Sequence, residues 1–263
     1  MKSSFFMGID IGVGTSKGVI INEEEKIVAY HILPSGFNYK LAAQKLLGEL
    51  LGKAGLTMEN LSYTVATGQG SPSVNFANEE VTDIVCCARG INKVFPSVRT
   101  VIDLGEQTSR VIHVDESGRV ANFMISEKCA GGSGYILRVV ANVLRVKLED
   151  LGPLSLKSEK PVSFTTRCAV FAETEIVSMV AEGFQKEDIV AGVHKALADK
   201  IFDLINRIGL KEPCAIAGGG GCDIGFVKRL KEKLRKEILI PPQPQIIMAL
   251  GAAIIGKKKF LSE

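Results

Sequence analysis

The chain has 263 residues, of which 46% are hydrophobic and 23% are charged, the balance of an ordinary soluble protein with room for two modest domains. Its formal net charge of +3 is too small to indicate nucleic-acid binding, and no stretch approaches the roughly 18 apolar residues of a membrane span. The six cysteines show no close pairing and no signal-peptide core is present, so we expect a cytoplasmic protein without disulfides.

Two similar segments fix the predicted order of the first elements. Residues 8–32, GIDIGVGTSKGVIINEEEKIVAYHI, match residues 101–125, VIDLGEQTSRVIHVDESGRVANFMI, without a gap at an offset of 93. Each copy predicts a strand, a tight turn, a second strand, another turn and a third strand. A chain built twice in this way indicates two related domains. We expect them at residues 1–97 and 98–263, and allow the last helix, 249–260, to pack on the first domain.

The remaining elements alternate between helices and strands, which indicates an α/β fold. Hydrophobic periodicity predicts helices after each of two cysteines, a polar connection between those helices at residues 152–161, and one long amphipathic helix. The long amphipathic helix is predicted over residues 186–208, other helices over residues 41–51, 81–94 and 226–234, and short strands over residues 63–66, 213–217 and 237–240.

The turn DIGVGTSKG, residues 10–18, combines backbone amides, two hydroxyls and a cation that could hold phosphate oxygens. It is not a P-loop, because GxxxxGK[ST] is absent and a strand follows. A lone hairpin of this kind is usually only a hairpin, but its duplicate at residues 103–110 favours two turns that hold a polyphosphate together. Asp10 and Asp103 could hold the waters of Mg²⁺ or orient an attacking water, or simply cap their own turns; their repetition favours the functional reading.

A glycine-rich stretch, AGGGGCDIGF at residues 217–226, stands between a predicted strand and a predicted helix. A flat base or ribose could lie against such a backbone. A tight connection without any ligand is almost as good an explanation.

Cys129 in KCAGGSGY and Cys168 in RCAVFAETE each stand shortly before a predicted helix, whose positive end would stabilise a thiolate. They lie 39 positions apart, too far for a CxxC finger, and two thiolates cannot fill the four positions of an iron–sulfur cluster or a structural zinc. A metal site would therefore need a second copy of the chain. We expect the other cysteines to be small buried hydrophobic residues and the three histidines to be structural. These cysteines are Cys86, Cys87, Cys214 and Cys222.

The paired DxG hairpins, the TGxG turn and the glycine-rich stretch together resemble the superfamily of actin, sugar kinases and heat-shock chaperone ATPases. KCAGGSGY and RCAVFAETE resemble, more narrowly, the BadF/BadG/BcrA/BcrD-type ATPases, over essentially the whole chain. These are the component-D activators of 2-hydroxyacyl-CoA dehydratases and the ATPase subunits of benzoyl-CoA reductases. The resemblance implies two duplicated RNase H-like domains with a nucleotide cleft between them.

The resemblance also implies a homodimer with one [4Fe-4S] cluster, held by Cys129 and Cys168 of each subunit. Such a protein couples the hydrolysis of Mg²⁺-bound ATP to ADP to the transfer of one electron. The electron would come from reduced ferredoxin or flavodoxin and go to a partner dehydratase or iron–sulfur reductase; no nucleic acid or membrane is expected. The implied catalytic residues are Asp10, Asp103 and Gln107. The implied nucleotide contacts are Gly12, Val13, Gly14, Thr15, Ser16, Lys17, Gly105, Glu106, Thr108, Gly218, Gly219, Gly220, Asp223 and Gln245.

Two departures from the family pattern bear on the nucleotide site. The second hairpin reads DLGEQT where the family usually has DIGGQD, which puts Glu106 in place of glycine and Thr108 in place of aspartate. A carboxylate beside a triphosphate costs affinity unless it points away or meets magnesium. Asp223 also stands where the family often has asparagine.

Three other functions remain open from the sequence. A small-molecule kinase of the same superfamily would use Asp103 as the base for a substrate hydroxyl. A dimer stapled by a four-cysteine zinc site would use the same thiolates without redox chemistry. A filament-forming or regulatory ATPase would need neither cysteine.

Overall fold

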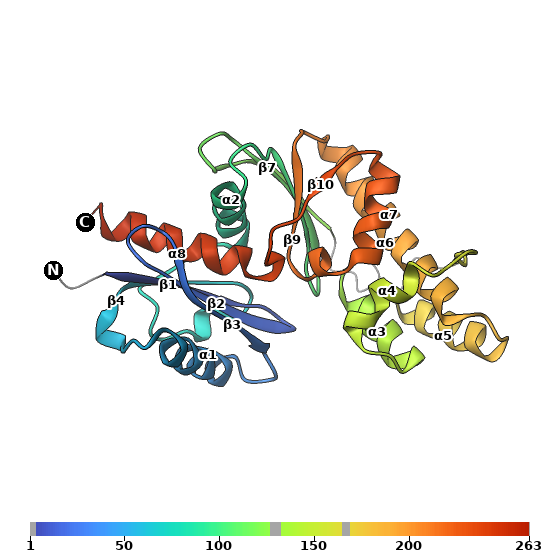
Figure 1. The fold of residues 1–263 in the computed structure, drawn as a ribbon, viewed down its shortest axis with the longest axis horizontal. Helices are drawn as coiled ribbons and strands as arrows, with labels where there is room; N and C mark the ends of the chain where they lie inside the picture. The colour runs from blue at the N-terminus through green and yellow to red at the C-terminus, as the bar shows by residue number, and fades with distance from the viewer. Residues whose placement is uncertain (1–3, 127–132, 165–168, 263) are drawn as a thin grey trace. The chain divides into compact units, whose positions relative to one another are not determined.

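The computed structural model describes residues 4–126, 133–164 and 169–262. The described chain forms two compact units. The first comprises the residues up to Val98, Val114–Ala121 and the residues from Gln245 onward; the second comprises Arg99–His113 and Asn122–Pro244. Figure 1 labels the α-helices and most of the strands of both units.

The first unit is built on a five-stranded sheet with the order β3-β2-β1-β4-β5. β1 runs antiparallel to β2 and parallel to β4, and all but its first residue are buried, because it lies at the centre of the sheet. The strands are β1 (Phe5–Ile11), β2 (Thr15–Ile21), β3 (Ile27–Pro34), β4 (Leu61–Thr67) and β5 (Glu79–Glu80).

Alternating residues of β1 send their side chains to opposite faces of this sheet, and helices cover both faces. Ile9 packs in one cluster with Leu46 of α1 (Tyr39–Ala54), whereas Phe6 packs in another with Leu250 of α8 (Ile247–Phe260). α8 also packs against α2 (Asp83–Val94), so the C-terminal helix lies beside elements from the start of the chain (Figure 1).

α2 and α8 approach each other at two glycines. A Cβ atom added at Gly251 would lie 1.8 Å from the carbonyl oxygen of Cys86, and one added at Gly90 would lie 2.0 Å from that of Ile247. Contact between the two backbones is this close only because both positions lack side chains.

The second unit repeats the arrangement of the first. Its five-stranded sheet has the order β10-β9-β6-β7-β8, in which β6 runs antiparallel to β7 and parallel to β9 as β1 does to β2 and β4. The predicted duplicated α/β fold is thereby confirmed in its sheets. The strands are β6 (Thr100–Leu104), β7 (Ser109–Val114), β8 (Val120–Ile125), β9 (Cys214–Ala217) and β10 (Ile238–Leu239).

The described part of the second unit contains five α-helices, whose apolar faces form one core with the sheet. α6 and α7 lie side by side, and both pack on α4 (Figure 1). This short helix overlaps residues 152–161, which the sequence predicted as a polar connection. Pro153 is accommodated because the first turn of a helix needs no amide hydrogen there. The helices are α3 (Tyr135–Leu144), α4 (Leu151–Ser155), α5 (Ala169–Ala181), α6 (Lys186–Ile208) and α7 (Ile224–Leu234). No helix among the described residues combines the length and apolar character that a membrane-spanning segment needs.

Candidate functional site

The first predicted phosphate turn joins β1 to β2. The amide of Gly12 donates to the carbonyl oxygen of Thr15 at 3.2 Å, which closes the turn, and a Cβ atom at Gly12 would lie only 2.9 Å from that oxygen. The turn therefore needs glycine at this position, since its backbone folds back on itself.

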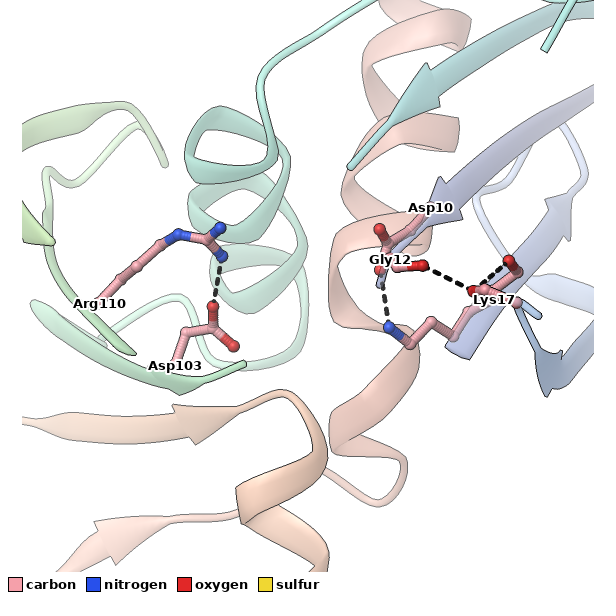
Figure 2. A network of polar contacts seen from close by, with 7 residues as sticks. Asp10, Gly12, Lys17, Asp103 and Arg110 are labelled. Atoms are coloured by element: carbon pink, nitrogen blue, oxygen red, sulfur yellow. Dashed lines mark hydrogen bonds and ion pairs between the residues drawn. The ribbon is translucent and has the colours of Figure 1, made fainter. Parts of the chain in front are cut away.

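Asp10 is buried just before this turn and carries its own counter-charge. Lys17 stands opposite Asp10 in the register of β1 and β2, and its Nζ lies 3.1 Å from the Oδ2 atom of Asp10. Figure 2 shows the lysine side chain pointing toward the carboxylate. Asp10 has an exposed fraction of only 3%, so the carboxylate is held in one place by packing and by this ion pair.

The second turn has the same construction. The amide of Gly105 donates to the carbonyl oxygen of Thr108 at 3.0 Å, and Arg110 stands opposite Asp103 with its Nη1 2.7 Å from the carboxylate (Figure 2). Asp103 is 1% exposed. The repeat thus preserves both the buried carboxylate and a cation on the neighbouring strand, with arginine in place of lysine.

The duplication extends further than the sequence comparison indicated. Gly68 follows β4 and Gly218 follows β9, both with positive φ. A Cβ atom at Gly68 would lie 2.4 Å from the Oδ1 atom of Asp10, and one at Gly218 would lie 2.4 Å from that of Asp103. Each buried carboxylate is therefore backed by a glycine that leaves no room for a side chain.

Ser35, which no sequence motif indicated, supports the first turn through its hydroxyl group. The hydroxyl of Ser35 donates to the carbonyl oxygen of Gly12 at 2.6 Å and lies 2.8 Å from the hydroxyl of Ser16. Both serines are buried. Ser16 is thereby tied into the turn. Ser35 is a small hydroxyl residue one position after β3 and three positions after the end of the predicted third strand, which was the only available signal for it.

The glycine-rich stretch enters a 3-10 turn, Gly219–Cys222, and then α7. Asp223 is the N-cap of α7: its Oδ1 atom accepts from the amide of Phe226 at 2.9 Å, and its Oδ2 atom lies 3.0 Å from Nε2 of the fully buried His194. Asp223 thus stabilises the helix that follows the glycines. Whether it also contacts a nucleotide stays a prediction.

Gln107, Gln245 and Glu106 are three further residues predicted for the nucleotide site. Gln107 is exposed in the second turn, and Gln245 is half-buried in the short 3-10 turn before α8. The carboxylate of Glu106 forms an ion pair with Arg138 of α3, in which Oε1 lies 2.7 Å from Nε.

The predicted cluster ligands, Cys129 and Cys168, lie outside the described residues, and their arrangement stays a prediction. Among the four described cysteines, burial raises the pKa of Cys86 to about 12 and that of Cys214 to about 11. Burial thus disfavours the thiolate form of both residues. Cys222 is exposed, which corrects the expectation that it is buried, because it ends the 3-10 turn at the surface. No group of three or more potential metal ligands occurs within the described residues.

Comparison with known protein families shows to which family the chain belongs. The sequence profile of the BadF/BadG/BcrA/BcrD ATPase family matches residues 7–256. This chain belongs to that family. The resemblance predicted from the cysteine motifs is confirmed.

Relatives within this family match over nearly the whole chain. The 2-hydroxyisocaproyl-CoA dehydratase activator of Clostridioides difficile is 38% identical over 95% of this chain and 94% of its own length. The (R)-2-hydroxyglutaryl-CoA dehydratase activating ATPase of Acidaminococcus fermentans is 38% identical over 98% of each chain.

Solved structures confirm the fold. The activator of the 2-hydroxyisocaproyl-CoA dehydratase from Clostridium difficile, with bound ADPNP, superposes with a TM-score of 0.94 at 36% identity, covering 98% of this chain and 96% of that one. A ROK family glucokinase from Streptomyces griseus reaches a TM-score of 0.58 at 14% identity, covering 97% of this chain and 99% of that one, which shows the shared fold alone.

Proposed function

We propose that this chain is an ATP-dependent reductive activator, which couples ATP binding and hydrolysis to the transfer of one electron to a partner metalloenzyme. The observation that carries the proposal is the pair of phosphate turns, each with a buried carboxylate and a facing cation, in a chain similar over its whole length to dehydratase activators. The partner would be a 2-hydroxyacyl-CoA dehydratase, a benzoyl-CoA reductase type enzyme or a related iron–sulfur reductase.

ATP is held in this proposal by both turns. The amides of Gly12 and Gly105 close the turns, and the other backbone amides of residues 12–16 and 105–108 would donate to phosphate oxygens, as those of glycine-rich turns commonly do. Lys17 and Arg110 are each already paired with a carboxylate, so they add little net positive charge. A triphosphate would therefore need Mg²⁺ for most of its charge compensation, and in this proposal Asp10 and Asp103 would hold the waters of Mg²⁺ or the attacking water.

The proposed cluster draws on a defined set of donors. Cys129 and Cys168, which stand in the two motifs that resemble the family, would supply the thiolate donors, and Cys168 immediately precedes α5 in the sequence. Two thiolates from each of two chains complete the four ligands of a [4Fe-4S] cluster. Such a cluster supplies one electron at low potential when bound.

An exposed apolar surface on and after α5 supports assembly with a second copy of the chain. Phe171, Val177 and Val180 of this helix are exposed, and Phe184 follows them. Large apolar side chains gathered on one exposed segment are typical of an interaction surface. Their position in sequence directly after Cys168 suits an interface that shares a cluster.

The coupling requires that nucleotide binds two states of the protein with different affinity. ATP would favour the state that docks on the partner and delivers the electron, and hydrolysis would release it. Reduced ferredoxin or flavodoxin would then return an electron to the activator.

Anaerobic purification followed by iron and acid-labile sulfide analysis tests this function. We expect about four iron and four sulfide per dimer, and loss of both in Cys129→Ser and Cys168→Ser. Cys222→Ser, which replaces an exposed cysteine, serves as the control and should keep the full content. Zinc without sulfide would instead support the stapled dimer, and a cluster that survives both serine variants would refute the ligand assignment.

A further inference from the structure

Glu106 is the feature of the second turn that distinguishes it from the first. The position equivalent to Glu106 in the first copy is Val13, so only the second turn carries a carboxylate between its glycine and its threonine. In a turn that binds phosphate, this negative charge would oppose the ligand, and the effect would be greatest for a triphosphate.

The structure shows where this charge is held. The Oε1 atom of Glu106 lies 2.7 Å from Nε of Arg138, which is one turn into α3. The two side chains are 23% and 42% exposed. An ion pair this accessible to solvent adds little to the stability of the fold. Its position beside the turn therefore says more about its role than its energy does.

The backbone fixes the position of Arg138 relative to the turn. The amide of Gly134 donates to the carbonyl oxygen of Gly105 at 2.8 Å, and the amide of Tyr135 donates to that of Glu106 at 3.2 Å. The first amides of α3, which have no partner within the helix, are therefore satisfied by the turn itself. Arg138 lies three residues after Tyr135, on the same side of the helix, and reaches back to Glu106.

We infer that Arg138 is a positioning residue of the nucleotide site, which holds the carboxylate of Glu106 away from the phosphates and so permits triphosphate binding. The inference rests on the proposed nucleotide site. It assigns to Arg138 a role through Glu106 and not a direct contact with the nucleotide. Without the guanidinium, the carboxylate would be free to turn toward the ligand with its charge uncompensated.

Affinities for ADPNP and ADP, measured by calorimetry on the full chain with Mg²⁺, test the inference. Arg138→Gln should weaken ADPNP binding about tenfold and ADP binding no more than about threefold, because the triphosphate carries more charge. Arg138→Lys should stay close to the wild type. The double variant Glu106→Gln/Arg138→Gln should recover ADPNP affinity to within about threefold of the wild type, because no carboxylate is left to hold.

Arg229→Gln is the matched control, since Arg229 forms a similar exposed ion pair with Glu232 on α7, 2.9 Å apart. It should leave both affinities unchanged, and thermal unfolding should show that all variants fold. Equal weakening of ADP and ADPNP in Arg138→Gln, or a double variant as weak as Arg138→Gln alone, would overturn the inference. A wild-type protein that bound neither nucleotide would instead refute the proposed function itself.

Discussion

Asp10 and Asp103 illustrate how single residues define this protein. Each carboxylate is almost fully buried, paired with one cation and backed by a glycine of positive φ. A buried charge is tolerated only when it is compensated in this way, and a change of any neighbour acts on the carboxylate first. The roles of these residues in catalysis can therefore be tested through the glycines behind them without removing the carboxylates.

Gly218→Ala should displace Asp103 and lower the rate of ATP hydrolysis at least about tenfold. The added methyl group would meet the Oδ1 atom of Asp103 at 2.4 Å, in a backbone conformation that already disfavours a side chain. Gly209→Ala is the matched control, because Gly209 has φ +85 but nothing within 4 Å of an added Cβ atom. It should cost about 1 to 3 kcal/mol of stability and leave hydrolysis within about twofold. Equal rates in both variants would contradict the role given to Asp103.

At the scale of elements, the crossing of α2 and α8 fixes the C-terminal helix to the first unit. The crossing depends on Gly90 and Gly251, where each helix meets the backbone of the other. Because backbone cannot move aside as a flexible side chain can, the contact has no tolerance for a methyl group.

Gly251→Ala should therefore lower the free energy of unfolding of the first unit by about 3 kcal/mol or more, measured by urea denaturation. Gly48→Ala is the matched control, since Gly48 lies on the exposed face of α1 with nothing within 4 Å of an added Cβ atom. Alanine should stabilise that helix by about 0.5 to 1 kcal/mol. Similar effects of the two substitutions would show that the crossing is looser than the structure indicates.

The repeat of the two strand triplets was visible in the sequence because the matching residues keep a constant offset of 93. The equivalence of Gly68 and Gly218 was not visible in the sequence, because these residues lie 150 positions apart instead of 93 and the two segments share only glycines. Helices α3 to α6, inserted between β8 and β9 in the second unit, account for the difference. Periodicity alone could not relate positions on the two sides of such an insertion.

The predicted phosphate turns were found by their residue types, whereas the contacts that hold them were not. Ser35 and Arg138 lie 23 and 32 positions from the turn residues Gly12 and Glu106 that they contact. Neither belongs to a motif. The sequence shows that residue 106 adds a carboxylate to the predicted phosphate turn. Only the three-dimensional position of α3 shows that an arginine lies beside this carboxylate.

The family membership and the two equivalent sheets support nucleotide binding, whereas the proposed electron transfer also depends on cysteines. Both units contain a predicted phosphate turn, but the two cysteines proposed as cluster ligands occur only in the part of the sequence that belongs to the second unit. The exposed apolar side chains on and after α5 follow Cys168 in the sequence. In the function proposed here, coupling belongs to the assembled protein, so its test has to follow nucleotide and cluster together.

Electron paramagnetic resonance of the anaerobically purified, dithionite-reduced protein tests this coupling most directly. We predict that the spectrum of the reduced cluster changes when ADPNP replaces ADP, because the two nucleotides favour different states of the dimer. We also predict that the signal is lost in Cys129→Ser and Cys168→Ser. A reduced protein whose spectrum is identical with ADPNP and with ADP would contradict an ATP-driven activator.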